Sequence, residues 1–389
     1  LMYNFVEKFQ FHVKETPDKT AIAADSGAAF FSYKDIDLLS GRVYAYLKKK
    51  GIGKEDFVAI VLPRGEKPVV SMIGVVKAGA AFVLLEDFTP PERIAYIVQD
   101  CGCKLKITME IWDEIMGTES LPGYEERDEH DAAFAVYTSG STGSPKGVIH
   151  ETGTIGQILR SFQDPTKKTA VRKSDVVVLL SPVSFVATCE VIFLPLSEGA
   201  EVHVLPFTIV KNPPALEEYL IRHEVTYFFL TPTLYRLMHN ISPTVRQIVF
   251  ASEMVSHVWD PDFVCICVYS SSESACCVSS FEIDKSYDRT PIGKMHEGIA
   301  YRIVDDHGKE VPKGDPGELC ITVPYFRGYL HLTEKNKQAF DSERYFHTGD
   351  LVKELPDGNI LLLGRLDEMI KVAGNRVEPA EVEAVVKQA

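Results

Sequence analysis

The sequence predicts an α/β fold of mainly parallel sheets flanked by helices, followed by a smaller part rich in antiparallel strands. Apolar runs of strand length alternate with segments of helical periodicity up to about residue 284, and this alternation is typical of parallel sheets with helices on both faces. From residue 285 the pattern changes to short alternating strands joined by DHG, KGDPG and PDG turns, which indicates antiparallel hairpins. The last residues, 377–389, have the pattern of a helix.

The alternation begins with a helical segment, 35–50, whose closing lysines precede Gly51, a residue type that often follows a helix. Strands are expected at 56–62, 80–85 and 105–108, and helices at 67–79 and at 89–102, the latter opened by proline. Strand-like and helix-like segments then continue at 175–180, 189–199, 200–206, 214–225, 226–231, 234–240, 246–252 and 263–269. The polar stretch 117–131 is the most linker-like part of the chain.

Charge and cysteine content exclude several classes of function. The 389 residues carry a formal net charge of −14, so no basic field is present to attract nucleic acid or an anionic membrane as the main partner. None of the eight cysteines forms a CxxC pair, and we expect reduced, buried thiols. The first ten residues lack the features of a secretory signal, and the apolar run 176–196 is broken by prolines, serines and a glutamate. We therefore expect a soluble, cytoplasmic protein.

The segment 137–147, YTSGSTGSPKG, predicts a phosphate-binding loop because it places glycines, hydroxyls and a lysine directly after an apolar strand. A Walker P-loop requires glycine before the lysine and serine or threonine after it. Here Pro145 precedes Lys146 and Gly147 follows it, which excludes the Walker type. A solvated linker would not be expected to follow a buried strand so abruptly.

The sequence YTSGSTGSPKGV closely resembles the phosphate loop of the adenylate-forming superfamily, which includes acyl-CoA synthetases, luciferases and the adenylation domains of nonribosomal peptide synthetases. Six further segments resemble motifs of this superfamily in the expected order, at 31–47, 76–94, 268–273, 317–330, 345–351 and 364–383. Two of them, 76–94 and 364–383, are most similar to the peptide-synthetase branch.

The resemblance implies the large N-terminal domain of the adenylate-forming fold, with two doubly wound, mainly parallel sheets and a smaller antiparallel subdomain. It places α/β nucleotide- and acid-binding subdomains at 1–284, a β-rich subdomain at 285–366, and the hinge Asp367 with the beginning of a truncated C-terminal domain at 367–389. The lysine that the C-terminal domain of this family supplies to adenylation is absent, so we expect the fragment to adenylate slowly or not at all.

The activity that the resemblance implies is ATP-dependent conversion of a carboxylic acid to acyl-AMP with release of pyrophosphate, with ATP and Mg²⁺ as cofactors. The acyl group would then pass to the phosphopantetheine thiol of a carrier protein. Two alternatives stay open: an acyl- or aryl-CoA ligase, and a non-catalytic scaffold domain of the same fold.

The resemblance also implies roles for individual residues. Tyr269 would stack on adenine, Ser272 would contact the α-phosphate, Glu273 would bind Mg²⁺, and Asp350, with Arg365 nearby, would bind the ribose hydroxyls. The residues expected around the β- and γ-phosphates are Thr138, Ser139, Gly140, Ser141, Thr142, Gly143 and Lys146. Thr138, Lys146, Ser272 and Glu273 are the ones expected to assist the reaction itself.

By the same mapping, an acid pocket is lined by Phe185, Val186, Ala187, Glu190, Phe229, Val249, Ala251, Val268, Cys276 and Cys277. Val186 stands where amino-acid-activating relatives carry an aspartate, and a desolvated ammonium facing valine would lack a partner. We therefore expect an acid without an α-amino group. Glu190 could pair with a remote amine or a hydroxyl, or could face solvent.

Two departures concern the nucleotide. The Gly-Pro-Thr of the family is Ser270-Ser271-Ser272 here, which keeps a hydroxyl but loses a stiff turn. Cys267 replaces an asparagine and is a poor partner for the adenine amino group. These departures motivate the scaffold alternative.

Overall fold

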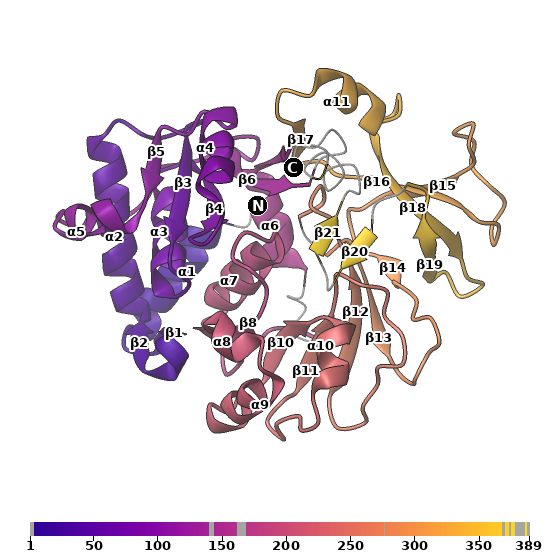
Figure 1. Ribbon diagram of the computed structural model, residues 1–389, viewed down its shortest axis with the longest axis horizontal. Coiled ribbons are helices and arrows are strands. Elements are labelled where there is room, and N and C mark those ends of the chain that lie inside the picture. The colour runs from indigo at the N-terminus through magenta and orange to yellow at the C-terminus, as the bar shows by residue number, and fades with distance from the viewer. Residues whose placement is uncertain are drawn as a thin grey trace.

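The computed structural model describes residues 4–139, 144–161, 169–275, 277–367, 370–372, 375–377 and 386. Two mixed sheets and a smaller antiparallel sheet make up the body of the protein, as the sequence predicted, and Figure 1 shows them arranged around the middle of the molecule. No helix in these described ranges is long and apolar enough to cross a membrane.

The first mixed sheet has six strands in the order β17-β7-β6-β4-β3-β5. Its members are β3 (Phe57–Leu62), β4 (Ala81–Glu86), β5 (Leu105–Ile107), β6 (Ala132–Thr138), β7 (Lys146–Glu151) and β17 (Phe326–Tyr329). Strands β3 to β6 pair in parallel, whereas β7 runs antiparallel to both β6 and β17. The predicted phosphate loop therefore connects two strands of a hairpin, not a strand to a helix.

The second mixed sheet has nine strands in the order β14-β13-β12-β11-β10-β8-β9-β1-β2. They are β1 (Thr20–Ala24), β2 (Ala29–Ser32), β8 (Val176–Leu179), β9 (Glu201–Val204), β10 (Tyr227–Leu230), β11 (Gln247–Phe250), β12 (Val264–Tyr269), β13 (Ser279–Ile283) and β14 (Lys294–Met295). The central strands are parallel and the two outer ends are antiparallel.

The antiparallel part follows, and it includes the predicted hairpins. Four strands pair in the order β15-β16-β18-β19, namely β15 (Tyr301–Val304), β16 (Gly317–Thr322), β18 (Tyr345–Glu354) and β19 (Ile360–Arg365). A short hairpin joins β20 (Ile370–Val372) to β21 (Asn375–Val377). After residue 285 the chain also returns to both earlier sheets, through β14 and β17.

Helices cover the sheets, and their apolar faces close the core. They are α1 (Phe5–Glu15), α2 (Tyr33–Lys49), α3 (Glu66–Lys77), α4 (Pro91–Asp100), α5 (Met109–Met116), α6 (Thr152–Arg160), α7 (Ala187–Ser197), α8 (Phe207–Val210), α9 (Pro213–Arg222), α10 (Pro232–Leu237), α11 (Thr333–Ala339) and the 3₁₀ turn Asp25–Gly27. Helix α2 begins at a capping box of Ser32 and Asp35, which satisfies two otherwise free backbone donors. Helices α6 and α7 pack against each other in the middle of the molecule (Figure 1), and α7 is buried along almost its whole length.

Candidate active site

A cavity of about 1290 Å³ brings together side chains from all three large sheets. Thr138 and Lys146 come from the β6–β7 hairpin, Tyr269 from the end of β12, and Asp350 from β18. Part of the wall lies at the carboxyl ends of the parallel strands β10 to β12, where open α/β sheets usually bind ligands.

The side of the cavity that holds Thr138 and Lys146, predicted to bind the phosphates and here called the phosphate side, contains a buried ion pair. Lys146 is 4% exposed, and its Nζ lies 3.5 Å from Oε1 of Glu273. The same carboxylate oxygen accepts a 2.8 Å hydrogen bond from the Tyr329 hydroxyl, and the ammonium lies 4.4 Å from the centre of the Tyr329 ring. The carboxylate and the ring face thus compensate the charge that Lys146 carries into the interior, and the phenol hydroxyl stabilises the carboxylate.

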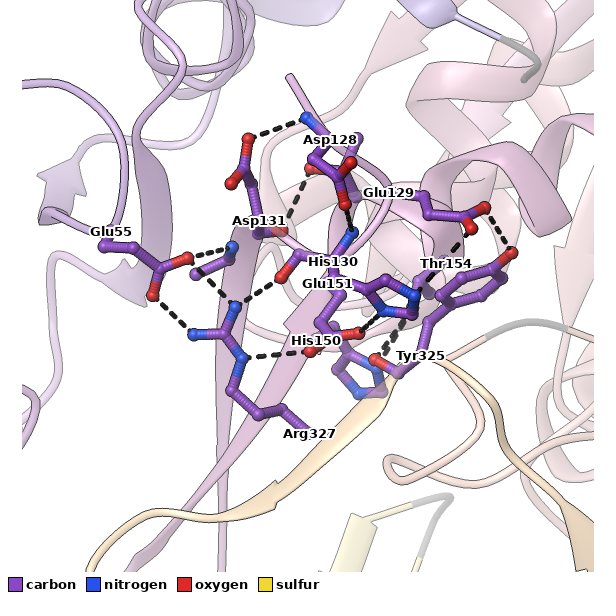
Figure 2. A network of polar contacts seen from close by, with 12 residues as sticks. Glu55, Asp128, Glu129, His130, Asp131, His150, Glu151, Thr154, Tyr325 and Arg327 are labelled. Atoms are coloured by element: carbon purple, nitrogen blue, oxygen red, sulfur yellow. Dashed lines mark hydrogen bonds and ion pairs between the residues drawn. The ribbon is translucent and has the colours of Figure 1, made fainter. Parts of the chain in front are cut away.

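Tyr329 was not predicted as a site residue, although it belongs to the RGYL motif. It lies on β17, which pairs with β7 so that Tyr329 is opposite Val148. Arg327, two residues earlier, fastens this strand: its guanidinium donates to Glu151 Oε1 at 3.1 Å and to Glu55 Oε1 at 2.9 Å (Figure 2). Tyr329 could not be placed from the sequence because its position depends on the pairing of β17 with β7, two strands that are far apart in the chain.

Thr138 lies opposite Lys146 across the hairpin. Its buried hydroxyl has no hydrogen-bond partner among the described residues, and such an orphaned donor next to a cation suits an anionic ligand. Ser139 also lines the cavity. The other residues predicted for this loop, Gly140, Ser141, Thr142 and Gly143, lie outside the described residues.

The segment Ser270–Ser272 is ordered by its own hydroxyls. The Ser271 N–H donates to Ser274 Oγ at 2.9 Å, and the Ser274 N–H donates to Ser271 Oγ at 3.2 Å. The Ala275 N–H also donates to the Ser271 carbonyl at 3.0 Å. These reciprocal bonds close a turn before and after Glu273, so the loss of a Gly-Pro sequence does not leave the segment without local order.

Three cavity residues that were predicted to bind adenine and ribose form a connected group: Tyr269, Asp350 and Arg365. Burial raises the pKa of the Tyr269 hydroxyl well above its ordinary value, and this hydroxyl donates to Asp350 Oδ2. Arg365 donates to Asp350 Oδ1 at 3.0 Å and to the Thr348 carbonyl at 2.8 Å. A carboxylate with two oxygens retains acceptor capacity for a ribose diol beside these donors.

The irregular part of β18 that carries Asp350 depends on Gly349 and Glu318. Gly349 has φ +71°, and a Cβ there would lie 2.7 Å from Arg365 Nη2, so glycine is favoured at this position. The Gly349 N–H donates to Glu318 Oε1 at 2.9 Å, and the other oxygen of Glu318 lies 2.9 Å from Nδ1 of His347. Cys320 lies 3.4 Å from the same ring nitrogen. These contacts fix the backbone immediately before Asp350.

On the acid side, Glu190 is buried and does not face solvent, which removes one of the predicted alternatives. It is 4% exposed, accepts from Ser161 Oγ at 3.1 Å and from the Cys277 thiol at 3.2 Å, and burial raises its pKa to about 7. The other predicted residues that line the cavity are Phe185, Val186, Ala187, Phe229, Ala251, Val268 and Cys277. The pocket is therefore an apolar chamber with a carboxyl group in its wall.

Two predicted pocket residues have different outcomes. Val249 lies inside β11, is fully buried in the core, and does not line the cavity. Cys276 lies outside the described residues. Cys267, which replaces an asparagine of the family, lines the cavity wall. Burial raises the pKa of its thiol to about 12. Asp367 accepts a 2.9 Å hydrogen bond from Arg365, while its role as a hinge stays a prediction.

The residues present fit a nucleotide with a divalent cation. Lys146 supplies a cation, Thr138 an unused buried hydroxyl, and Asp350 an acceptor in one continuous cavity. Glu273 offers the hard oxygen ligand that Mg²⁺ prefers.

Comparisons with known proteins agree with this geometry. The chain is 29% identical over 412 residues to gramicidin S synthase 2 of Brevibacillus brevis, with 97% of this chain and 9% of that protein covered. It therefore spans about a tenth of the length of that relative. An artificially fused adenylation–PCP di-domain, NpsA-ThdA from Klebsiella oxytoca, superposes with a TM-score of 0.86 at 20% identity, covering 100% of this chain and 84% of that one.

A second similar structure is the anthranilate CoA ligase AuaEII in complex with anthranoyl-AMP, with a TM-score of 0.85, 23% identity, and coverage of 100% of this chain and 82% of the other. At these identities the two structures establish the fold, which is the one that the motifs predicted. The model of the AMP-binding enzyme family matches residues 9–330. The chain is a member of the AMP-binding enzyme family.

Proposed function

We propose that the chain provides the Mg·ATP site and the carboxylic-acid site of an enzyme that activates the acid as acyl-AMP. The observation that carries this proposal is the convergence of three features in one cavity: the buried Lys146–Glu273 pair, the Asp350–Arg365 pair, and an apolar pocket with Glu190 in its wall. The first two suit the phosphates and the ribose, and the third suits the acid.

In the proposed reaction a carboxylate oxygen of the acid attacks the α-phosphorus of ATP. The bond from that phosphorus to the oxygen bridging to the β-phosphate breaks, and pyrophosphate leaves with the electron pair. Because two anions must approach each other, the chain has to supply positive charge and donors at the phosphates. Lys146, Thr138 and Ser272 line the cavity where this is needed. A magnesium ion at Glu273 would neutralise further phosphate charge.

The acid is proposed to lack an α-amino group. Val186 opens helix α7 at the cavity wall, and the carboxyl of Glu190 is one helical turn further on. An α-ammonium at Val186 would have no anionic partner, whereas a hydroxyl or remote amine on the acid could bond to Glu190. The apolar walls formed by Phe229, Ala251 and Val268 would select mainly by volume.

The acyl acceptor is proposed to be the phosphopantetheine thiol of a carrier protein. The motifs at 76–94 and 364–383, together with the similarity to gramicidin S synthase 2, favour this acceptor over coenzyme A. Transfer assays with both acceptors distinguish them: faster acylation of coenzyme A than of a carrier protein would favour the ligase alternative.

Nucleotide binding by calorimetry tests the proposal most directly. The unmodified chain is expected to bind AMP and Mg·ATP, and Asp350→Asn is expected to weaken AMP binding by about 100-fold because charge-assisted bonds to a diol contribute about 1.5–3 kcal/mol each. Lys337→Ala, at an exposed surface pair, is the control and should bind normally.

Absence of binding at millimolar Mg·ATP would contradict the catalytic proposal and support a scaffold domain. A panel of acids in a pyrophosphate-exchange assay, run on a protein that also contains the C-terminal catalytic lysine, then tests the acid. A preference for simple α-amino acids would contradict the inference from Val186.

A further inference from the structure

A buried histidine behind the phosphate side has no role in the sequence predictions. His150 lies on β7, four residues after Lys146, so both side chains lie on the same face of the strand. It is 0% exposed, and its ring stacks on Phe134 with centroids 4.8 Å apart. Figure 2 shows the imidazole beside Thr154, beneath the network that fastens β17 to β7.

The hydrogen bonds of His150 define its protonation. Nε2 lies 2.7 Å from the carbonyl oxygen of Ser272, and because a carbonyl only accepts, Nε2 carries the proton and donates. Nδ1 is then the acceptor, and the Thr154 hydroxyl lies 3.5 Å from it. Burial lowers the pKa of His150 to about 4, so the ring is neutral around pH 7 and this single tautomer is retained.

The contact with Ser272 holds the backbone that presents Glu273. The Ser272 carbonyl belongs to the peptide bond that joins Ser272 to Glu273. The carboxylate of Glu273 in turn contacts the ammonium of Lys146. Strand β7 therefore holds this dipeptide at two points, by the imidazole at its backbone and by the ammonium at its carboxylate. The Ser271–Ser274 turn orders the same segment locally but does not attach it to the neighbouring sheet.

We propose that His150 is a positioning residue for Ser272 and Glu273, and that its Nε2–H sets the place of the magnesium-binding carboxylate. This inference rests on the proposed function, in which Glu273 binds the metal of Mg·ATP. It deepens that function because it assigns the geometry of the metal site to a residue that touches neither nucleotide nor metal.

A histidine that merely fills the core makes different predictions from one that positions the metal site. Loss of packing would lower stability and weaken every ligand alike. Loss of positioning would weaken the metal-dependent ligand selectively, and a side chain that restores the donor would reverse the effect. AMP binds without magnesium and therefore reports on the fold, the ribose side and the contact of Ser272 with the α-phosphate, whereas Mg·ATP reports on Glu273 as well.

The experiment compares His150→Phe with His150→Gln. Phenylalanine keeps a ring against Phe134 but has no donor, and the glutamine amide nitrogen can reach about as far as Nε2. We expect His150→Phe to weaken Mg·ATP binding by about 10-fold and AMP binding by a clearly smaller factor, about 3-fold or less. His150→Gln should recover most of both losses. His307→Phe, at an exposed turn, is the matched control.

Several outcomes would overturn the inference. Wild-type Mg·ATP affinity in His150→Phe, or equal losses for AMP and Mg·ATP in both variants, would show a structural role only. If His150→Phe does not fold, His150→Asn replaces it, since asparagine is too short to reach Ser272, and the same selective loss is required. If the unmodified chain binds neither nucleotide, the proposed function fails and the inference falls with it, whereas normal binding with unaffected variants rejects the inference alone.

Discussion

The nucleotide side and the acid side of the cavity treat buried charge in different ways. On the nucleotide side each carboxylate has a cation beside it: Glu273 has Lys146, and Asp350 has Arg365. On the acid side Glu190 is contacted by a hydroxyl and a thiol, and burial raises its pKa to about 7. The paired side can hold a highly charged ligand at any pH near neutrality, whereas the acid side changes its charge within that range.

The largest expected effect comes from breaking the pair on the nucleotide side. Lys146→Met leaves Glu273 buried without its ammonium partner, and removing one member of a buried pair costs about 3–5 kcal/mol. Urea unfolding measures this loss. The double variant Lys146→Met, Glu273→Gln should recover most of the stability without recovering Mg·ATP binding. Equal stability of the single and double variants would show that the pair is not coupled.

A similar loss of stability, which develops between about pH 4.3 and about pH 7, is expected from Glu190. Its folded pKa of about 7 lies above the value of about 4.3 expected for an unfolded chain. Between these values the unfolded state releases the proton while the folded state retains it, so folding stability falls as pH rises through this window.

Glu190→Gln removes this dependence. Relative to the wild type, the variant should gain about 3 kcal/mol of stability between pH 4.5 and pH 8, as measured by denaturant unfolding at both values. Parallel pH profiles of the two proteins would contradict the neutral, buried carboxyl.

A smaller effect, on substrate preference, is expected when a carboxylate that can pair with a cation is introduced on the acid side. Val186→Asp places a carboxylate at the start of α7, where it can pair with an α-ammonium. Pyrophosphate exchange should shift by about 10-fold in favour of α-amino acids, since a charge-assisted hydrogen bond contributes about 1.5–3 kcal/mol and part of this is lost in desolvating the new group. Val186→Asn, which lacks the charge, should shift the preference less.

The smallest effect tests the hydroxyl of Tyr329. Tyr329→Phe removes the 2.8 Å bond to Glu273 and keeps the ring near Lys146. One hydrogen bond of this kind contributes about 0.5–1.5 kcal/mol, so Mg·ATP affinity should fall by less than about 10-fold while AMP affinity is unchanged. A larger loss for AMP than for Mg·ATP would place the hydroxyl in a different role.

The nucleotide side could be predicted from the sequence because its residues lie in short local motifs. Lys146 ends a hydroxyl-rich loop, Glu273 follows an apolar strand, and Asp350 follows Gly349 in the HTGD sequence of β18; all three reach the cavity. Tyr329 and His150 could not be placed, since their importance arises from contacts across 56 and 122 positions of sequence with Glu273 and Ser272. Such contacts depend on which strands become neighbours.

The acid side was predicted less well for a different physical reason. Val249 and Ala251 belong to the same stretch, but Val249 lies within β11 and Ala251 follows its end, so only Ala251 reaches the cavity. Position along the strand and side-chain size act together, since Phe229, the larger register partner of Val249 on β10, does line the cavity. For Glu190, exposure depended on how completely other elements cover α7, which no local pattern records.

The placement of the site residues on three different sheets has a consequence for the stability of the protein. Lys146 is on the six-stranded sheet, Tyr269 on the nine-stranded sheet and Asp350 on the four-stranded sheet. A nucleotide that touches all three residues would hold the three sheets together. A ligand that binds only the native state stabilises it by mass action, so saturating nucleotide would stabilise all three sheets together.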